Sequence, residues 1–317
     1  MANADQIKAL IKTHFDGDFE KFTTISLQVA AHEAKLGHTK LADDIRKIVD
    51  KSKLNKLRLK PFNQNLEGLI LQVEPMERLS DLIVSEQILE RIERIINEYI
   101  QVDKLRRHNL ENRRKILLSG PPGTGKTMTA SIIANELELP LYVILMDKMV
   151  TKFMGETSAK LRQVFDCIEE KQGVYLFDEF DAIGTHRAKD NDVGEMRRVL
   201  NSFLQFIEHD NSESLIIAAT NNLGLLDQAL FRRFDDVLHY ELPSNAEKLL
   251  LLENRLGSYA GKFDLNSIVD NMDNLSHAEI SKACSDAIKE SILTDKGKVD
   301  KSLIIRMIND KKAAYHQ

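Results

Sequence analysis

The segment GPPGTGKT, residues 120–127, constrains the fold of this chain more than any other stretch. It directly follows the short apolar run KILLS, residues 115–119, and a helical pattern begins near Lys126. The glycines allow backbone N–H groups to converge in the loop, and the start of the helix turns its positive dipole end toward the same point. The sequence therefore predicts a strand, an anion-binding loop and a helix in succession. A simple Gly/Pro turn between a strand and a helix is the alternative.

Short apolar runs alternate with helical patterns through the middle of the chain. Besides 115–119, they are LYVIL (141–145), VYLFD (174–178), LIIAAT (215–220) and VLHYEL (237–242). Runs this short and this uniformly apolar are typical of strands that are buried on both faces. We therefore predict an α/β fold with a five-stranded parallel sheet and helices on both faces.

The pattern divides the chain into four parts. Residues 1–60 carry three helical stretches and form an N-terminal domain for a partner or substrate, or a surface that only caps the rest. Residues 61–78 are a linker with room for one strand, and 79–243 form the α/β nucleotide-binding part. Residues 244–317 are helical throughout, with Ser244 as an N-cap, and form a lid.

The composition limits where the protein works. The formal net charge is −5. The main basic cluster, residues 51–60, is more typical of a solvated linker than of a nucleic-acid site. Two cysteines, Cys167 and Cys284, argue against a disulfide framework. There is no signal-like N-terminus and no apolar run long enough for a membrane span. We expect a cytoplasmic protein without a membrane partner.

The loop at 120–127 has the pattern of a P-loop, or Walker A motif. In this pattern Lys126 reaches the outer phosphates of a nucleotide and the Thr127 hydroxyl binds Mg²⁺. The other residues of the loop that we expect to contact the nucleotide are Pro121, Pro122, Gly123, Thr124, Gly125 and Met128.

Two adjacent carboxylates, Asp178 and Glu179, end the apolar run 174–178. Carboxylates beside a buried strand cost desolvation energy unless a cation or a reacting water is near. Asp178 is therefore predicted to hold the Mg²⁺ shell (Walker B), and Glu179 to orient or deprotonate the attacking water. A strand that simply ends in solvent is the alternative.

Four motifs in order, GPPGTGKT, FDEFD, AATNN and ALFRRFDD, carry a resemblance to a known family. From about Leu79 to Leu293 the chain resembles the classical AAA ATPase module. The resemblance implies ATP hydrolysis with ATP and Mg²⁺ as cofactors, and a homo-oligomeric ring, by precedent a hexamer. It also implies that Asn221 senses the γ-phosphate and that Arg232 and Arg233 are arginine fingers in the neighbouring subunit's site. The compact RRF segment is similar to that of the branch of the family that contains microtubule-severing and membrane-complex-disassembling ATPases.

The adenine site follows from the same resemblance. SHAEI, residues 276–280, stands where the family has Ser-Gly-Ala-Asp, so that His277 replaces a glycine and lies beside Ala278. Asp81, Leu82 and Ile83 are expected on the other side of the base. We expect no lid arginine at the nucleotide.

The segment MVTKFMGET, residues 149–157, resembles the axial pore loop of threading AAA proteins. Lys152, Phe153 and Met154 would enter the ring channel, where Phe153 grips an extended polypeptide by apolar contact. The alternative is that Phe153 belongs to the core.

Together these features predict a ring-forming ATPase that remodels, unfolds or threads a polypeptide. Small single-module relatives of this form are similar to ATPases encoded beside a subtilisin-like protease, with defence against phage as the implied setting. A nucleic-acid remodeller that uses residues 51–60, and an ATP-dependent assembly switch, are the alternatives.

Overall fold

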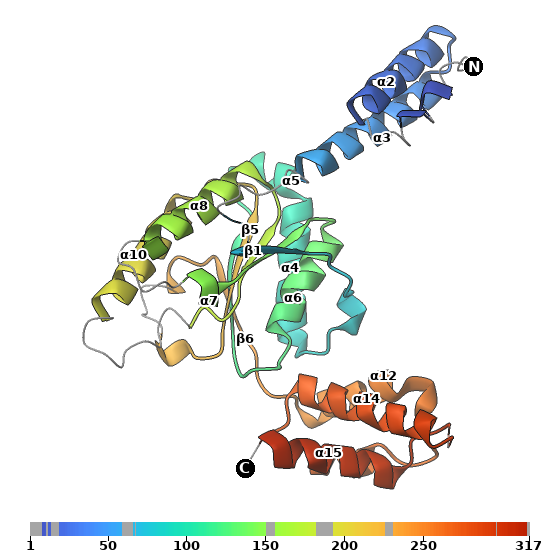
Figure 1. Ribbon diagram of the computed structural model, residues 1–317, viewed down its shortest axis with the longest axis vertical. Helices are drawn as coiled ribbons and strands as arrows, with labels where there is room; N and C mark the ends of the chain where they lie inside the picture. Colours follow the sequence, from blue (N-terminus) through green and yellow to red (C-terminus); the bar gives the residue numbers. More distant parts are fainter. Residues whose placement is uncertain are drawn as a thin grey trace. The chain divides into compact units, whose positions relative to one another are not determined.

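The computed structural model describes residues 8–10, 12–13, 19–58, 66, 68–149, 156–181, 193–225, 231–295 and 297–315 (Figure 1). The chain divides into two compact units, Met1–Phe62 and Asn63–Gln317, and each is described by itself.

The N-terminal unit contains a helical hairpin. Helices α2 (Phe19–Lys35) and α3 (Thr39–Arg58) pack against each other. The turn between them uses Gly37 at φ +87°, in the left-handed region that glycine adopts without steric cost. His38 after the turn is paired with Glu33, with 2.7 Å between Nδ1 and Oε2. The helical periodicity predicted for this region is therefore present.

The second unit is built on a six-stranded sheet with the order β1-β3-β4-β5-β2-β6. The strands are β1 (Ile70–Val73), β2 (Lys115–Ser119), β3 (Leu141–Ile144), β4 (Val174–Phe177), β5 (Leu215–Thr220) and β6 (Asp236–His239). The five predicted strands are present and parallel. The sheet has one strand more than we predicted, because β1 adds an antiparallel edge to β3.

β1 was not assigned from the sequence because its apolar pattern is interrupted, whereas the other edge strand, β6, was predicted. Its Ile70 is buried, whereas Leu71 is 53% exposed, so the segment lacks the continuous apolar character of the buried strands. The strand falls inside 61–78, the segment predicted as a linker with room for one strand. The sheet order also places β2 beside β5 and β5 beside β4, so their carboxyl ends meet at one edge.

Helices cover both faces of the sheet (Figure 1). The helical elements of this part are η2 (Leu79–Asp81), α4 (Glu86–Ile100), α5 (Val102–Arg106), α6 (Lys126–Glu136), α7 (Met146–Met149), α8 (Glu156–Glu170), α10 (Val193–His209) and η3 (Leu223–Leu225). Helices α4 and α6 lie on one face, and α8 and α10 on the other. The prediction of helices on both faces is confirmed.

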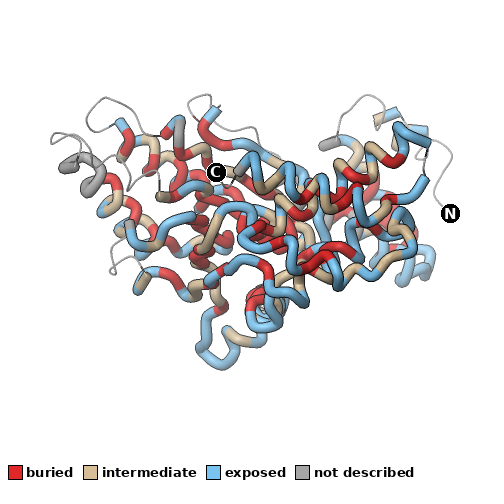
Figure 2. The backbone as a smooth tube through the Cα atoms, turned by 90° about the horizontal axis from the view of Figure 1, so that it is seen from below, coloured by how far each residue is buried: buried red, intermediate tan, exposed pale blue. Residues whose placement is uncertain are grey.

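Each face has its own core. Ile88, Ile92 and Ile95 recur at helical spacing on α4 and are buried against the sheet. On the other face Phe203 of α10 packs edge-on against Phe177 of β4, with ring centroids 5.2 Å apart. The strands β4 and β5 are buried throughout, and Figure 2 shows buried residues gathered in the interior of the trace with exposed residues toward its outside. This packing on both faces fixes the strands whose carboxyl ends meet at one edge of the sheet.

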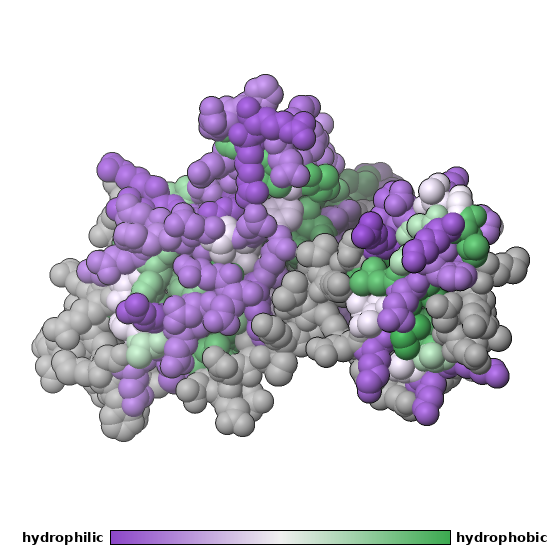
Figure 3. Space-filling view, turned by 90° about the horizontal axis from the view of Figure 1, so that it is seen from above, coloured by the Kyte–Doolittle hydropathy of each residue, from purple (hydrophilic) through white to green (hydrophobic). Residues whose placement is uncertain are grey.

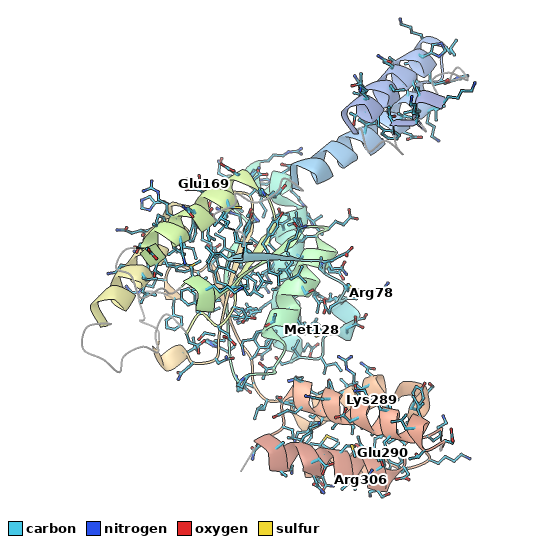
Figure 4. All side chains as sticks on the ribbon, in the orientation of Figure 1. Arg78, Met128, Glu169, Lys289, Glu290 and Arg306 are labelled. Carbon is cyan, nitrogen blue, oxygen red and sulfur yellow. The ribbon has the colours of Figure 1, made fainter. Side chains whose placement is uncertain are left out.

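The C-terminal helices form the lid. They are α12 (Asn245–Leu256), η4 (Gly257–Tyr259), α13 (Asn266–Val269), η5 (Asp270–Met272), α14 (His277–Leu293) and α15 (Lys301–Tyr315). The predicted Ser244 cap is confirmed, since its hydroxyl accepts from the Glu247 N–H in a capping box. Glu290 and Arg306, labelled in Figure 4, form an ion pair between α14 and α15.

The described surface is mostly hydrophilic in the view of Figure 3. Among the described residues, no helix is both long and apolar enough to cross a membrane.

Candidate active site

A cavity of about 430 Å³ lies at the carboxyl ends of β2, β4 and β5, under the lid. It gathers residues that are far apart in the sequence. The predicted residues that line it are Asp81, Ile83, Pro122, Gly123, Thr124, Gly125, Lys126, Thr127, Met128, Asp178, Glu179, Asn221, His277 and Ala278. The predicted Leu82 lines it too, as do Leu251, Arg255 and Ser281. Met128, at the start of α6, is labelled in Figure 4.

Two glycines of the loop leave no room for a side chain. Gly120 has φ +144°, and a Cβ there would lie 2.2 Å from the Tyr240 carbonyl oxygen. Gly123 has φ +73°, and a Cβ there would lie 2.6 Å from Ser276 Oγ on the lid. The loop is therefore shaped by close backbone approach on one side and by the lid on the other.

Lys126 is buried inside the loop. Its ammonium donates to the carbonyl oxygens of Gly120 and Pro121, each at 2.8 Å. Burial lowers the pKa of Lys126, and the charges of Asp178 and Asp181 oppose that shift. A desolvated cation held by neutral carbonyls is ready to interact with phosphate oxygens. Pro121 contributes this carbonyl but is not among the described residues that line the cavity.

The two predicted magnesium ligands are in direct contact. Thr127 Oγ1 donates to Asp178 Oδ2 at 2.8 Å, and Asp178 Oδ1 accepts from the Glu179 N–H at 2.9 Å. In the described part of the chain, no group of three His, Cys, Asp or Glu residues could hold a metal. One hydroxyl and one carboxylate fit Mg²⁺, which keeps waters and binds substrate phosphates rather than an all-protein cage.

Glu179 has an unusual backbone. It adopts φ +52°, a left-handed conformation that is uncommon for a residue with a side chain. The residue is exposed and lines the cavity with Asn221. Strained backbone of this kind clusters at catalytic sites, where the surrounding structure holds it in place.

Asp181 orients the end of β5, and the sequence analysis did not assign it a role. Its Oδ1 accepts from the Asn221 N–H at 3.3 Å and from Thr220 Oγ1 at 3.4 Å. Asp181 is the last residue of the FDEFD motif, and this position is the sequence signal that could have identified it. Asp181 thus joins the segment after β4, which contains Glu179, to the end of β5 and to Asn221, which follows it.

The opposite end of the cavity is formed by the lid and by residues 81–83. The Ala278 N–H donates to the Gly123 carbonyl at 3.0 Å, which ties the start of α14 to the loop. Burial lowers the pKa of His277, and the negative charge of Glu247 opposes this. The expectation of no lid arginine differs from the structure, because Arg255 of α12 lines the cavity. Its place depends on how the lid packs, which its helical pattern does not indicate.

The remaining predicted residues lie elsewhere. Arg232 and Arg233 are exposed and are not among the described residues that line the cavity of their own chain. Arg233 Nη1 is 3.0 Å from Glu208 Oε1. Lys152, Phe153 and Met154 lie outside the described residues.

The comparisons with known proteins agree with this geometry. A model of the ATPase family associated with various cellular activities (AAA) matches residues 116–242. An uncharacterized AAA family ATPase, y4kL, from Sinorhizobium fredii is 32% identical over 317 residues, which cover 98% of this chain and 96% of the relative. The chain belongs to the AAA family. This AAA protein is accordingly an ATP hydrolase that binds nucleotide.

Other relatives match only part of their own length. The proteasome-activating nucleotidase of Aeropyrum pernix is 32% identical over 73% of this chain and 59% of the relative. The peroxisomal ATPase pex6 of Schizosaccharomyces pombe is 33% identical over 63% of this chain and 22% of the relative. The AAA protein therefore shares an ATPase module with these relatives, not their full architecture.

Proposed function

We propose that this AAA protein hydrolyses ATP with Mg²⁺ at the interfaces of a homo-oligomeric ring and uses the energy to remodel, unfold or thread a polypeptide. The observation that carries the proposal is the group of Lys126, Thr127, Asp178, Glu179 and Asn221 around one cavity. A phosphate cradle, a magnesium position, a base and a sensor are all required for hydrolysis, whereas nucleotide binding alone requires only the first two.

Each residue has a distinct part in the reaction. The loop N–H groups and Lys126 hold the phosphates, and Thr127 and Asp178 would hold Mg²⁺, which neutralises charge on the phosphate oxygens when it is bound. Glu179 takes the proton of the water that attacks the γ-phosphorus. The bond to the β-phosphate oxygen breaks, and ADP and phosphate are formed. Asn221, oriented through Asp181, positions this water.

The exposed arginines support action between subunits. Arg232 and Arg233 are exposed and are not among the described residues that line their own cavity, which supports a role for them in the site of a neighbouring copy. In related enzymes such a cation accelerates the reaction by roughly 10³ to 10⁵. The resemblance implies that the ring is a hexamer.

A polypeptide is the cargo that the relatives favour. Their names include proteasome-activating nucleotidases and an ATP-dependent zinc metalloprotease, both of which concern protein breakdown. The acidic net charge disfavours nucleic acid as a general cargo. A separate subtilisin-like protease, a role in phage defence and a cytoplasmic location stay predictions from the sequence.

The direct test is steady-state ATPase activity of wild type and Phe153→Ala, with the oligomer size measured in the same samples. An unfolded protein and single-stranded DNA are added in turn. We expect only the polypeptide to stimulate turnover and the Phe153 substitution to remove that stimulation. Stimulation by DNA alone would make the protein a nucleic-acid remodeller. ATP-dependent assembly without turnover would make it a switch.

Action between subunits has its own test. The variant with Arg232→Ala and Arg233→Ala should bind ATP but hydrolyse little. Mixing it with Lys126→Ala subunits, which carry intact arginines and a dead site, should restore turnover. Full activity of the double variant alone would refute the role of these arginines.

A further inference from the structure

Tyr240 lies where the sheet passes into the lid. It directly follows β6, and residues 241–243 separate it from Ser244, the N-cap of α12. Its side chain is only 3% exposed, and it is not among the described residues that line the nucleotide cavity. A buried tyrosine hydroxyl nearly always has a hydrogen-bond partner, so the partner shows what this residue is attached to.

The partner is a threonine in the helix that follows the phosphate loop. Tyr240 OH and Thr129 Oγ1 lie 2.6 Å apart, and Thr129 is fully buried. Thr129 Oγ1 also donates to the Gly125 carbonyl at 3.1 Å. Because a hydroxyl has a single proton, the proton between the two side chains is that of the tyrosine. The two hydroxyls therefore form a chain from Tyr240 through Thr129 to Gly125, the N-cap of α6.

Tyr240 contacts the other end of the loop through its backbone. Its N–H donates to the Ser119 carbonyl at 2.6 Å. Its carbonyl oxygen lies so close to Gly120 that a Cβ on that glycine would be 2.2 Å away. One residue therefore touches the loop 120–127 where it leaves β2, and through Thr129 also holds the point where the loop enters α6.

The position of Gly125 matters because the phosphate-binding groups follow it directly. Lys126 and Thr127 are the first residues of α6, so a shift of Gly125 moves the ammonium and the hydroxyl together. Neither Tyr240 nor Thr129 is among the described residues that line the cavity, so both act on a ligand only through other residues. An apolar pair of similar volume could fill the same space, and packing alone therefore does not require two hydroxyls.

We propose that Tyr240 is a positioning residue for the nucleotide phosphates, which holds the start of α6 through the Thr129 hydroxyl and links it to the strand that leads into the lid. This inference rests on the proposed binding of nucleotide at the loop. The bond between the hydroxyls depends on direction as well as distance, so it fixes Thr129 more narrowly than an apolar contact does. The turn at Gly125 is fixed with it.

A double-mutant cycle separates positioning from stability. The variants are Tyr240→Phe, Thr129→Val and the combination of both. The dissociation constant of ADP, which is bound without being hydrolysed, and thermal unfolding of the nucleotide-free protein are measured for each. Each single substitution breaks the pair, and should lower the unfolding midpoint by about 2 to 4 °C and weaken ADP binding about fivefold.

The double variant gives the deciding result. Replacing both partners by apolar groups of the same shape removes the unpaired hydroxyl, so the unfolding midpoint should largely recover. The link from β6 to Gly125 is still missing, so ADP binding should stay about fivefold weaker than in wild type.

Two matched variants serve as controls. Thr129→Ser keeps the hydroxyl and should bind ADP as tightly as wild type. Tyr175→Phe removes another buried tyrosine hydroxyl, which donates to the Lys171 carbonyl at 2.8 Å. Neither Tyr175 nor Lys171 is among the described residues that line the cavity, so this variant should lower the unfolding midpoint and leave the affinity unchanged.

Two results would overturn the inference. One is wild-type affinity for ADP in Tyr240→Phe. The other is a double variant whose affinity recovers together with its unfolding midpoint, since the pair would then be a packing contact only. If Thr129→Val does not fold, the comparison of Tyr240→Phe with Tyr175→Phe decides by the same criterion. Failure of the proposed function would look different, because wild type would then bind no nucleotide.

Discussion

The two ends of the nucleotide cavity are built in different ways. Most of the predicted phosphate end comes from one contiguous segment, 120–127, in which polar groups pair within the loop, as when Thr124 Oγ1 donates to the Pro121 carbonyl at 2.8 Å. The base end is assembled from residues 81–83, α12 and the start of α14, and it contains a buried imidazole without a partner among the described residues. The phosphate end is therefore held largely by contacts within the loop, whereas the base end depends on how the lid packs.

This difference predicts that overall nucleotide affinity and preference among nucleotides are set at different ends of the cavity. Changes at the phosphate end should affect every nucleotide alike, because all of them carry the same phosphates. Changes at the base end should alter which nucleotide is preferred. The following predictions test this distinction, from the largest expected effect to the smallest.

Lys126→Ala should weaken the binding of ATP and GTP to a similar degree and reduce turnover by at least about 100-fold, because it removes the buried cation that faces the phosphates. The measurements are competition binding and steady-state ATPase activity. Lys115→Ala is the matched control, since Lys115 is also partly buried and its ammonium donates to the Asp210 carbonyl outside the cavity. If Lys126→Ala weakened the binding of ATP but not of GTP, the proposed difference between the two ends would be wrong.

Gly123→Ala should disturb both the phosphate loop and its contact with the lid. The new Cβ would lie 2.6 Å from Ser276 Oγ, and the residue would keep a φ of +73°. We expect ATP affinity to fall by about tenfold and the apo protein to lose about 1 to 3 kcal/mol of stability, measured by binding and thermal unfolding.

Gly297→Ala separates the two causes of the Gly123 effect. Gly297 also has a positive φ, +66°, but a Cβ added there would have no heavy atom within 4 Å. It should therefore lose only about 1 kcal/mol, with ATP affinity unchanged. Equal effects of the two substitutions would mean that the contact between loop and lid does not matter.

Asp286→Asn should have the smallest effect, because it lies between lid helices rather than at either end of the cavity. Lys311 Nζ is 2.7 Å from Asp286 Oδ2, and this contact, followed by Lys289, holds the pKa of Asp286 below its usual 3.8. A carboxyl with a depressed pKa stabilises the fold above the unfolded-state value, and this stabilisation is lost as the pH falls through the folded-state value.

The variant should therefore lose about 0.5 kcal/mol at neutral pH, and its difference from wild type should shrink below pH 3.8. Thermal unfolding as a function of pH measures this, with nucleotide preference expected to stay as in wild type. A difference that persists in strong acid would point to packing rather than charge.

The sequence predicted the buried part of the sheet better than its edge. Strands such as β4 and β5 are covered on both faces, and therefore read as unbroken apolar runs. At β1, exposed Leu71 interrupts that signal, so the edge strand could not be separated from a linker. The P-loop, the Asp178–Glu179 pair and the Ser244 cap were predictable because their chemistry is complete within a few consecutive residues.

The sequence by itself determined the glycine pattern of the loop 120–127 and the place of Lys126 in it, because Lys126 reaches the Gly120 carbonyl within one short segment. Only the tertiary structure decided that Arg255 lines the cavity and that both ring nitrogens of His277 are buried without a partner in the described part of the chain. Burial and desolvation depend on which distant segments pack together, and no short stretch of sequence contains that information. The arrangement of the base end therefore depends on how the lid packs, whereas the predicted phosphate binding depends mainly on the loop.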